Sequence, residues 1–143
     1  MPAAIIEPLE LLMFGAIGMT TLALAGSSTR ELTLSGWRAL VVLDRSETTR
    51  VGALAKSVGM PLPSASRLIR RLERDGLVTT ERDETDRRAT LVKLTPKGHR
   101  LRDRVVARRR ALMEEALASR SPKIPRGLAP GLAAIARAFE PYS

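Results

Sequence analysis

The stretch that decides the fold is residues 61–98, PLPSASRLIRRLERDGLVTTERDETDRRATLVKLTPKG. Its first part places apolar residues, among them Leu68 and Leu72, at helical spacing and leaves arginines on the remaining surface. Ser64 is a residue type that caps helix starts, and Gly76 is the type that ends helices in the left-handed conformation. We therefore predict a basic helix that Ser64 caps and Gly76 ends.

Two β-segments follow this helix and are joined by a charged turn. Residues 77–80 and 89–94 are rich in β-branched side chains and alternate in polarity. Residues 81–88 between them are charged at almost every position, which predicts a solvated turn. A basic helix followed by a hairpin with arginines at its tip is a shape suited to gripping a DNA duplex.

The positive charge of the chain is concentrated after residue 66. The formal net charge is +9; residues 1–66 carry five basic and five acidic side chains, and residues 67–110 carry fifteen basic and seven acidic ones. A local basic field favours a polyanionic partner, because neutralised phosphates release their counterions. An ordinary solvated surface rich in arginine (20 Arg against 4 Lys) is the alternative interpretation. Residues 61–90 are nearly neutral, so the field that attracts DNA is predicted to come mainly from residues 97–110.

The residue inventory does not support an enzyme, a metal site or a cofactor. The chain has no cysteine, which excludes disulfides and thiol-based redox sensing. Its single histidine, His99, argues against a zinc site within one chain and is predicted to be a surface residue. The sequence shows no nucleophile with a base and no phosphate-binding glycine loop. We predict that the protein is not an enzyme.

The N-terminal segment poses a choice between a membrane and a protein partner. Residues 11–29 are nineteen residues without a charge, long enough to span a bilayer. Glycine, serine and threonine dilute its apolar character, and Glu7 and Glu10 precede it where a membrane helix prefers basic residues. A helix that is apolar on more than one face is usually buried between protein surfaces. We predict a subunit interface, with membrane association as the alternative.

Further helices are predicted on both sides of the deciding stretch. Two short helices precede the hairpin, joined by a glycine-containing turn, and the second of them is basic, which is the helix-turn-helix pattern. A long helix that opens with proline follows the hairpin, and a final short helix ends the chain. The expected bounds are residues 33–44, capped by Thr33 or Ser35, then residues 49–58, 95–119 and 131–139.

Three adjoining motifs resemble the MarR family of winged-helix transcriptional regulators. LTLSGWRALVVL (32–43) is similar to the helix that precedes the family's helix-turn-helix, and RVGALAKSVGMPLPSASRLIRRLERDGLV (50–78) is similar to the helix-turn-helix itself. DETDRR (83–88), followed by ATLVKLTPKGHRL (89–101), is similar to the family's wing. The motifs are contiguous and correctly spaced over about half of the chain.

The resemblance implies a mainly α fold with a small β-hairpin wing, as a single domain. It also implies a cytoplasmic homodimer that binds a pseudo-palindromic double-stranded DNA operator, usually as a repressor that a small-molecule effector releases. The implied organisation of the domain (1–143) is a winged helix-turn-helix DNA-binding lobe over 33–94, with dimerisation helices over 1–30 and 95–143.

Two departures from the family pattern bear on function. After its Gly-Leu-Val, the family often has Glu-Arg and further arginines, where this chain has Thr79, Thr80 and Glu81. We therefore expect one DNA backbone contact from the first strand of the wing to be missing. The lack of cysteine removes the peroxide-sensing subclass. A winged-helix adaptor, whose basic helix docks an acidic protein instead of DNA, is the alternative from another functional class.

The residues expected to contact DNA come from three places in the lobe. N-terminal residues of a recognition helix reach base edges in the major groove, and the helix dipole favours a nearby phosphate. Arg67 is the candidate for a bidentate guanine contact, with a phosphate or a salt bridge to Glu73 or Asp75 as the alternatives. The resemblance implies that a wing-tip arginine enters the minor groove, and we predict that Asp86 pairs with the other arginine. The candidates are Ser64, Ser66, Arg67 and Arg70 on the recognition helix, Asp86, Arg87 and Arg88 on the wing, and Thr48, Thr49 and Arg50 for the DNA backbone.

An effector pocket is expected between the dimerisation helices and the DNA-binding lobe. Met13, Phe14 and Trp37 are its candidate apolar walls. The alternative is that each of these side chains belongs to the core.

Overall fold

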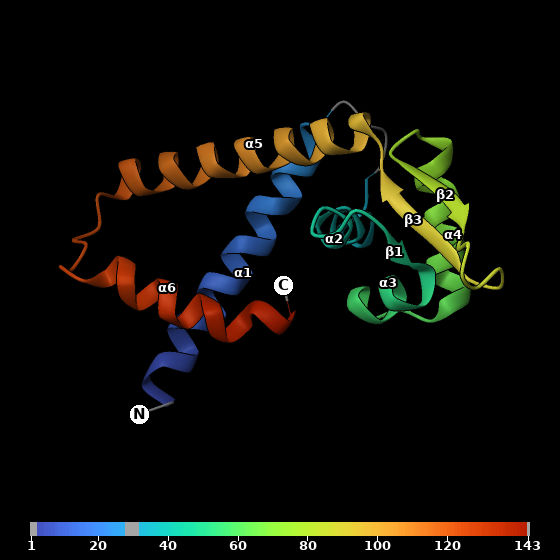
Figure 1. Ribbon diagram of the computed structural model, residues 1–143. Coiled ribbons are helices and arrows are strands. Elements are labelled where there is room, and N and C mark those ends of the chain that lie inside the picture. The colour runs from blue at the N-terminus through green and yellow to red at the C-terminus, as the bar shows by residue number, and fades with distance from the viewer. Residues whose placement is uncertain (1–2, 28–31, 143) are drawn as a thin grey trace.

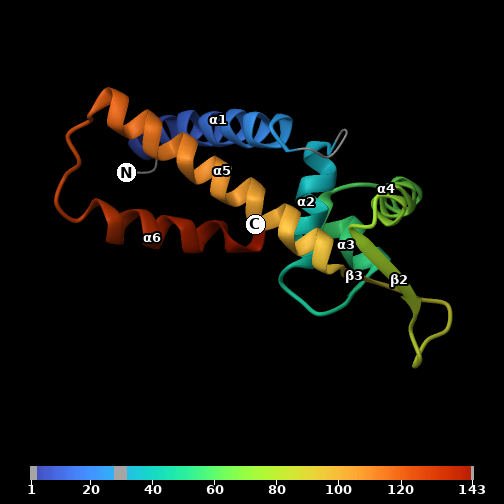
Figure 2. The same ribbon diagram turned by 90° about the horizontal axis from the view of Figure 1, so that it is seen from above.

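The computed structural model describes residues 3–27 and 32–142. Most of these residues are helical, and a small antiparallel sheet completes the fold, as predicted (Figure 1). Three helices form an extended arm, and a lobe that contains the remaining helices and the strands lies at one end of it (Figure 2). The helices are α1 (Ala3–Ala25), α2 (Leu34–Leu43), α3 (Val51–Val58), α4 (Leu62–Arg74), α5 (Pro96–Arg120) and α6 (Leu128–Phe139), followed by the 3₁₀ turn η1 (Glu140–Tyr142).

The sheet has three strands in the described chain, one more than the hairpin that the sequence predicted. Strands β2 (Val78–Arg82) and β3 (Thr90–Leu94) form the hairpin, and β1 (Thr49–Arg50) pairs with the other edge of β3. The prediction that residues 49–50 begin the third helix was therefore wrong. The extended pair satisfies backbone groups of β3 that would otherwise form an open edge.

The start of the recognition helix α4 also differs from the prediction. The helix begins at Leu62, and the N-cap is Pro61, which has an extended backbone and no side-chain hydrogen bond. Proline in the first turn is compatible with a helix start, because the first amide groups have no partner within the helix. Ser64 therefore lies inside the first turn. Its hydroxyl accepts a hydrogen bond from the Arg67 guanidinium (3.2 Å), so its predicted role as the cap was wrong.

The C-terminal end of α4 is fixed to the beginning of α5. Gly76 adopts the left-handed conformation predicted for it (φ 72°). The Thr95 hydroxyl donates to the Gly76 carbonyl (2.6 Å), and the Thr95 amide donates to the Leu77 carbonyl (3.0 Å). The Lys97 ammonium donates to the Asp75 carbonyl (2.6 Å). Three consecutive carbonyls after the recognition helix thus receive donors from the segment that opens α5.

The core fills the space between α2, α3, α4, the sheet and the first half of α5. Helix α4 is strongly amphipathic: Ala65, Ile69 and Leu72 are buried, whereas most of its arginines face solvent. This pattern follows directly from apolar residues spaced at three and four positions. The side chains that are most completely buried are Leu40, Leu43, Leu54, Leu72, Leu77, Val78, Val92, Leu101 and Val105.

Other helix ends match or extend the predictions. The hydroxyls of Thr33 and Thr95 accept hydrogen bonds from the amides three residues later (3.1 Å each), so both threonines are the caps of α2 and α5. Helix α6 begins at Leu128, three residues before the predicted start, and includes Pro130 in its first turn. Proline is tolerated there for the same reason as in α4.

Replacement of Gly98 by alanine tests the junction between α4 and α5. A Cβ atom at this position would overlap the Leu77 backbone carbonyl, which cannot move without disturbing the hydrogen bond from Thr95. We expect Gly98→Ala to lower the free energy of unfolding by about 1–3 kcal/mol, the usual cost of overpacking. Urea denaturation measures this change.

Gly52 provides the matched control, because it also lies in a helix but a Cβ atom there meets nothing within 4 Å. Gly52→Ala is expected to raise stability by about 0.5–1 kcal/mol through helix propensity. Equal effects of the two substitutions would contradict the close approach at Gly98.

Candidate nucleic-acid interface

The outward face of α4 is basic and lies at the same end of the molecule as the wing (Figure 2). Arg67, Arg70 and Arg74 are exposed, and together with Glu73 they line a shallow hollow of about 600 Å³. The core-facing residues of α4 fix the rotation of the helix, so its arginines point away from the lobe. The four predicted recognition residues share this helix, with Ser64 and Ser66 half-buried beside the exposed guanidinium groups.

Arg67 forms no salt bridge with Glu73 or Asp75, the two partners that the sequence offered as alternatives to a DNA contact. Its guanidinium donates to the Ser64 hydroxyl (3.2 Å), which holds the side chain along the first turns of α4. The Glu73 carboxylate instead accepts hydrogen bonds from the amide (3.2 Å) and the hydroxyl (2.8 Å) of Thr80. Glu73 therefore joins α4 to strand β2, and the charge of Arg67 is available to a ligand.

The wing tip differs from the predicted arrangement of its carboxylates. The Asp86 carboxylate accepts a hydrogen bond from the backbone amide of Arg88 (3.1 Å), so the prediction of a pair with an arginine side chain was wrong. An aspartate readily bonds the amide two residues later, which competes with longer-range pairing. Within the described residues, the guanidinium groups of Arg87 and Arg88 are exposed and have no hydrogen-bond or ion-pair partner.

Asp83, which the sequence did not single out, holds the base of the wing. Its carboxylate accepts hydrogen bonds from the hydroxyl (2.8 Å) and the amide (3.0 Å) of Thr85, and its other oxygen lies 2.7 Å from the Arg50 guanidinium. The side chain is buried, with 12% of its surface exposed. The Thr85 hydrogen bonds, followed by Arg50, lower the pKa of Asp83 below its ordinary value.

The candidates for DNA-backbone contacts have different surroundings. Arg50 precedes α3 and pairs with Asp83, although half of its side-chain surface remains exposed. The Thr49 hydroxyl lies 2.8 Å from the Ser46 hydroxyl, and Thr48 is exposed immediately before β1. The pairing of Arg50 with Asp83 therefore couples the wing to the segment that carries both threonines.

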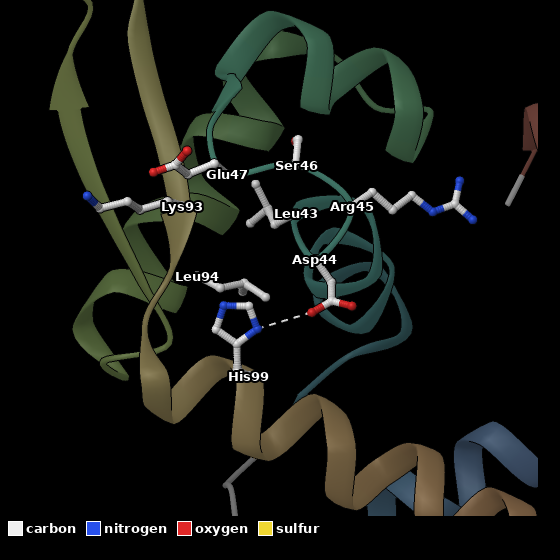
Figure 3. A pocket seen from close by; sticks show the side chains of 8 residues that line it. All are labelled: Leu43, Asp44, Arg45, Ser46, Glu47, Lys93, Leu94 and His99. Carbon is white, nitrogen blue, oxygen red and sulfur yellow. Dashed lines mark hydrogen bonds and ion pairs between the residues drawn. The ribbon is translucent and has the colours of Figure 1, made fainter.

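A second hollow lies where the loop after α2 meets α5 (Figure 3). It has a volume of about 320 Å³, and the Asp44 carboxylate at its edge lies 3.1 Å from His99 Nδ1 and 3.2 Å from Arg102 Nε. His99 is a surface residue, as predicted, with about half of its side chain exposed. In the described part of the chain, no three His, Cys, Asp or Glu side chains are placed to hold a metal ion. The contacts of Asp44 instead join α2 to α5.

The predicted effector pocket corresponds only in part to a cavity between α1, α2 and α3. This cavity has a volume of about 410 Å³, and the Trp37 ring forms part of its wall while remaining 6% exposed. Met13 and Phe14 do not line it; both are more than half exposed on α1. Met13 is on the face of α1 that carries Ile17 and Thr20, but it lies one turn before Ile17 and so beyond the cavity, whereas Phe14 points to another side of the helix. The lining residues are Ala16, Ile17, Thr20, Leu34, Ser35, Trp37, Arg38 and Val58.

The lobe is similar to proteins of a known family. A sequence model of the MarR family matches residues 31–89, which span α2, α3, α4, β2 and the wing tip. Over this part of the chain, the protein resembles the MarR family. MarR proteins are transcriptional regulators, and the fold observed here is their winged helix-turn-helix.

Proteins similar to this chain are distant from it in sequence and close to it in fold. An HTH-type transcriptional regulator of Bacillus subtilis, YfiV, is 26% identical over 110 residues, which cover 77% of this chain and 69% of YfiV. The crystal structure of RV1404 from Mycobacterium tuberculosis has a TM-score of 0.82 at 23% identity, over 95% of this chain and 92% of that one. The structure of NadR in complex with 4-hydroxyphenylacetate has a TM-score of 0.63 at 21% identity, over 96% of this chain and 89% of that one.

The titration of Asp83 tests the proposed bracing of the wing. Because its pKa is lowered on folding, the carboxylate stabilises the wing above its ordinary pKa of 3.8, and this contribution is lost as the pH falls through the lower folded value. We expect a wild-type midpoint below 3.8, measured from the carboxyl carbon by NMR. Thr85→Val removes the leading cause and should raise the midpoint, and Arg50→Gln should raise it less.

Arg100→Gln on α5 removes the same charge as Arg50→Gln outside the wing and should leave the Asp83 midpoint unchanged. A wild-type midpoint at or above the ordinary value would contradict the described hydrogen bonds.

Proposed function

We propose that this protein is a MarR-family homodimeric repressor that binds a pseudo-palindromic double-stranded DNA operator. The observation that carries the proposal is the presence of exposed guanidinium groups on both α4 and the wing. These two elements lie at the same end of the molecule (Figure 2). A recognition helix enters the major groove, and an arginine on a projecting hairpin suits a narrow minor groove of high negative potential. Residues 33–94 form the DNA-binding lobe in this proposal, and residues 1–30 and 95–143 form the dimerisation helices.

Each predicted DNA contact is assigned a role from its place in the lobe. Arg67, in the first turns of α4, contacts a base edge, and Arg70 lies one turn further along the same face. Ser64 holds Arg67 in position through its hydroxyl, and Ser66 contributes a further polar group at the start of the helix. Arg88 and Arg87 enter or flank the minor groove. Asp86 shapes the turn through the Arg88 amide, and Thr48, Thr49 and Arg50 lie along the DNA backbone.

The case for a homodimer comes from apolar surface on the long helices. Helix α6 has no buried residue although its sequence is LAPGLAAIARAF, and α1 exposes a run of large apolar side chains. Such surface requires a partner in water. A second copy of the chain supplies matching surface, because the helices of the arm all carry it. The exposed residues include Ile6, Leu11, Leu12, Met13, Phe14, Ile17 and Leu22 on α1, Met113 and Leu117 on α5, and Leu128, Leu132 and Phe139 on α6.

Membrane association through α1 is the competing explanation for this surface. Helix α1 has the length and composition of a membrane-spanning helix, with a mean hydropathy of 1.6. However, its C-terminal part packs against α5, it contains Glu7 and Glu10, and apolar residues of α5 and α6 are exposed as well. A protein interface accounts for all three helices, whereas a membrane accounts for one. We therefore propose a cytoplasmic dimer.

We also propose that a small-molecule effector in the Trp37 cavity releases the DNA. The cavity of about 410 Å³ lies between α1 of the arm and α2 and α3 of the lobe, so its occupant touches both parts. The structure of NadR, which shares this fold, holds 4-hydroxyphenylacetate. A ligand that changes the angle between arm and lobe would alter the spacing of the two recognition helices in a dimer.

Substitution of placed arginines tests DNA recognition. Arg67→Ala is expected to weaken binding to a selected operator by about 1–3 kcal/mol and to relax base preference at one position. Arg88→Ala is expected to weaken binding and to lower the slope of log affinity against log salt concentration by about one. Fluorescence anisotropy with operator and scrambled DNA at several salt concentrations measures both effects.

Arg120→Ala, at the far end of α5, is the control for loss of a single positive charge. It should leave both the affinity and the base preference near wild type. Equal effects of all three substitutions would mean that charge alone drives binding. Tight binding to an acidic protein, with no preference for any DNA sequence, would support the adaptor alternative and refute the proposal.

A further inference from the structure

The start of the recognition helix α4 carries an exposed apolar tip. Pro61, Leu62 and Pro63 are all exposed, and Leu62 is 54% exposed. Within residues 32–94 of the described chain, the other exposed large apolar side chain is Leu34, which lines the Trp37 cavity. Leu62 therefore stands apart, because neither the core nor that cavity accounts for its apolar surface.

The two prolines of this tip also remove hydrogen-bond donors from the helix start. The first backbone bond of the helix runs from the Ala65 amide to the Pro61 carbonyl (3.0 Å), so the nitrogens of residues 61–64 lie before it. Proline has no N–H group, and consequently only Leu62 and Ser64 have an amide to offer here. Phosphate binding at a helix N-terminus depends on such amides. This helix start is therefore poor in phosphate donors and rich in apolar surface.

Leu62 lies in one row with two residues that the proposed function assigns to DNA. Residues four positions apart are neighbours on one side of a helix, so Leu62, Ser66 and Arg70 follow one another along α4. Arg70 is exposed on the basic face, and Leu62 occupies the N-terminal end of the row, from which a recognition helix contacts base edges. The apolar tip thus belongs to the DNA-facing side of the lobe.

Thymine is the base whose major-groove edge suits an apolar side chain. Each base pair presents its own pattern of donors and acceptors in this groove, and the C5-methyl group of thymine is the apolar feature of that pattern. Contact between this methyl group and a leucine removes apolar surface of both partners from water. An apolar tip with few amide donors therefore favours a thymine edge over a phosphate.

We propose that Leu62 contacts the C5-methyl group of a thymine in each operator half-site and so determines base preference at that position. This inference rests on the DNA-binding function proposed above and adds a specificity-determining residue to it. Arg67 selects a guanine by hydrogen bonds, whereas Leu62 selects a thymine by apolar contact. The two side chains therefore read different base pairs of the half-site.

Replacement of thymine by deoxyuridine tests the contact, because it removes the methyl group and keeps every Watson–Crick hydrogen bond. The operator is first obtained by selection from random double-stranded DNA, and its thymines are then replaced one position at a time in both half-sites. At one position, wild-type affinity should fall by about fourfold for each half-site, which corresponds to the burial of one methyl group. Thymines outside the reach of α4 are the internal controls, and fluorescence anisotropy measures the affinities.

Two substitutions of Leu62 identify the side chain that senses the methyl group. Leu62→Ala should bind the thymine and deoxyuridine operators equally well, because its side chain is too short to make the contact. Alanine is also a good helix former, so this exposed substitution should retain the fold. Leu62→Met keeps a long apolar side chain and should retain part of the discrimination. Neither variant should change the slope of log affinity against log salt concentration, because an apolar contact releases no counterions.

Two results overturn the inference. One is a selected operator whose binding to the wild-type protein no deoxyuridine weakens, and the other is a loss of affinity that Leu62→Ala shows to the same extent as wild type. Both results leave the proposed DNA-binding function intact. Failure to select any operator refutes that function itself, and the role of Leu62 falls with it.

Discussion

The rest of the structure depends on the turn at residues 75–77, where the recognition helix meets the long helix of the arm. The backbone carbonyls of residues 75–77, which follow α4, accept hydrogen bonds from Thr95 and Lys97 at the start of α5. The left-handed conformation of Gly76 allows the chain to turn here. Gly98 lies so close to the Leu77 carbonyl that no Cβ atom fits between them. Because the same turn leads into β2, the start of α5 is tied to both α4 and the hairpin by one backbone hydrogen bond and two from side chains.

The charged residues of the lobe form two groups: carboxylates that are hydrogen-bonded within the lobe, and arginines whose guanidinium groups are exposed. The carboxylates of Glu73 and Asp83 accept hydrogen bonds within the lobe. Glu73 bonds Thr80 and so joins strand β2 to α4, and Asp83 bonds Thr85 at the base of the wing and the Arg50 side chain. Arg87 and Arg88 keep exposed guanidinium groups, and Arg67 bonds only the neutral hydroxyl of Ser64. Glu73 and Asp83 thus hold the elements that carry Arg67, Arg87 and Arg88 without pairing with these three arginines. This explains how a segment whose net charge is nearly zero can present a basic surface.

The sequence was sufficient for features that local chemistry controls. The sequence predicted the amphipathic spacing of α4, the left-handed Gly76, Thr33 as one of two candidate caps of α2, and the charged wing turn. Each of these features depends on residues within a few positions. Features that depend on distant partners were missed. Thr49 and Arg50 form a strand only because β3 offers an open edge. The contact between Asp83 and Arg50 was missed because the two residues are 33 positions apart in the sequence. Ser64 was a plausible cap, but Pro61 and Pro63 fix an earlier start. Met13 lies too far toward the N-terminus of α1 to reach the cavity, and Phe14 points to another side of that helix.

The central claim is that two copies of this lobe present α4 and the wing to DNA in a fixed relation. Selection of bound sites from random double-stranded DNA tests it most directly, with the purified full-length protein at moderate salt. The account predicts enrichment of a pseudo-palindrome whose half-sites are separated by about one helical turn, 10–10.5 base pairs, or a multiple of it. No enrichment over the starting pool, or enrichment of a single half-site without its inverted repeat, would contradict the account.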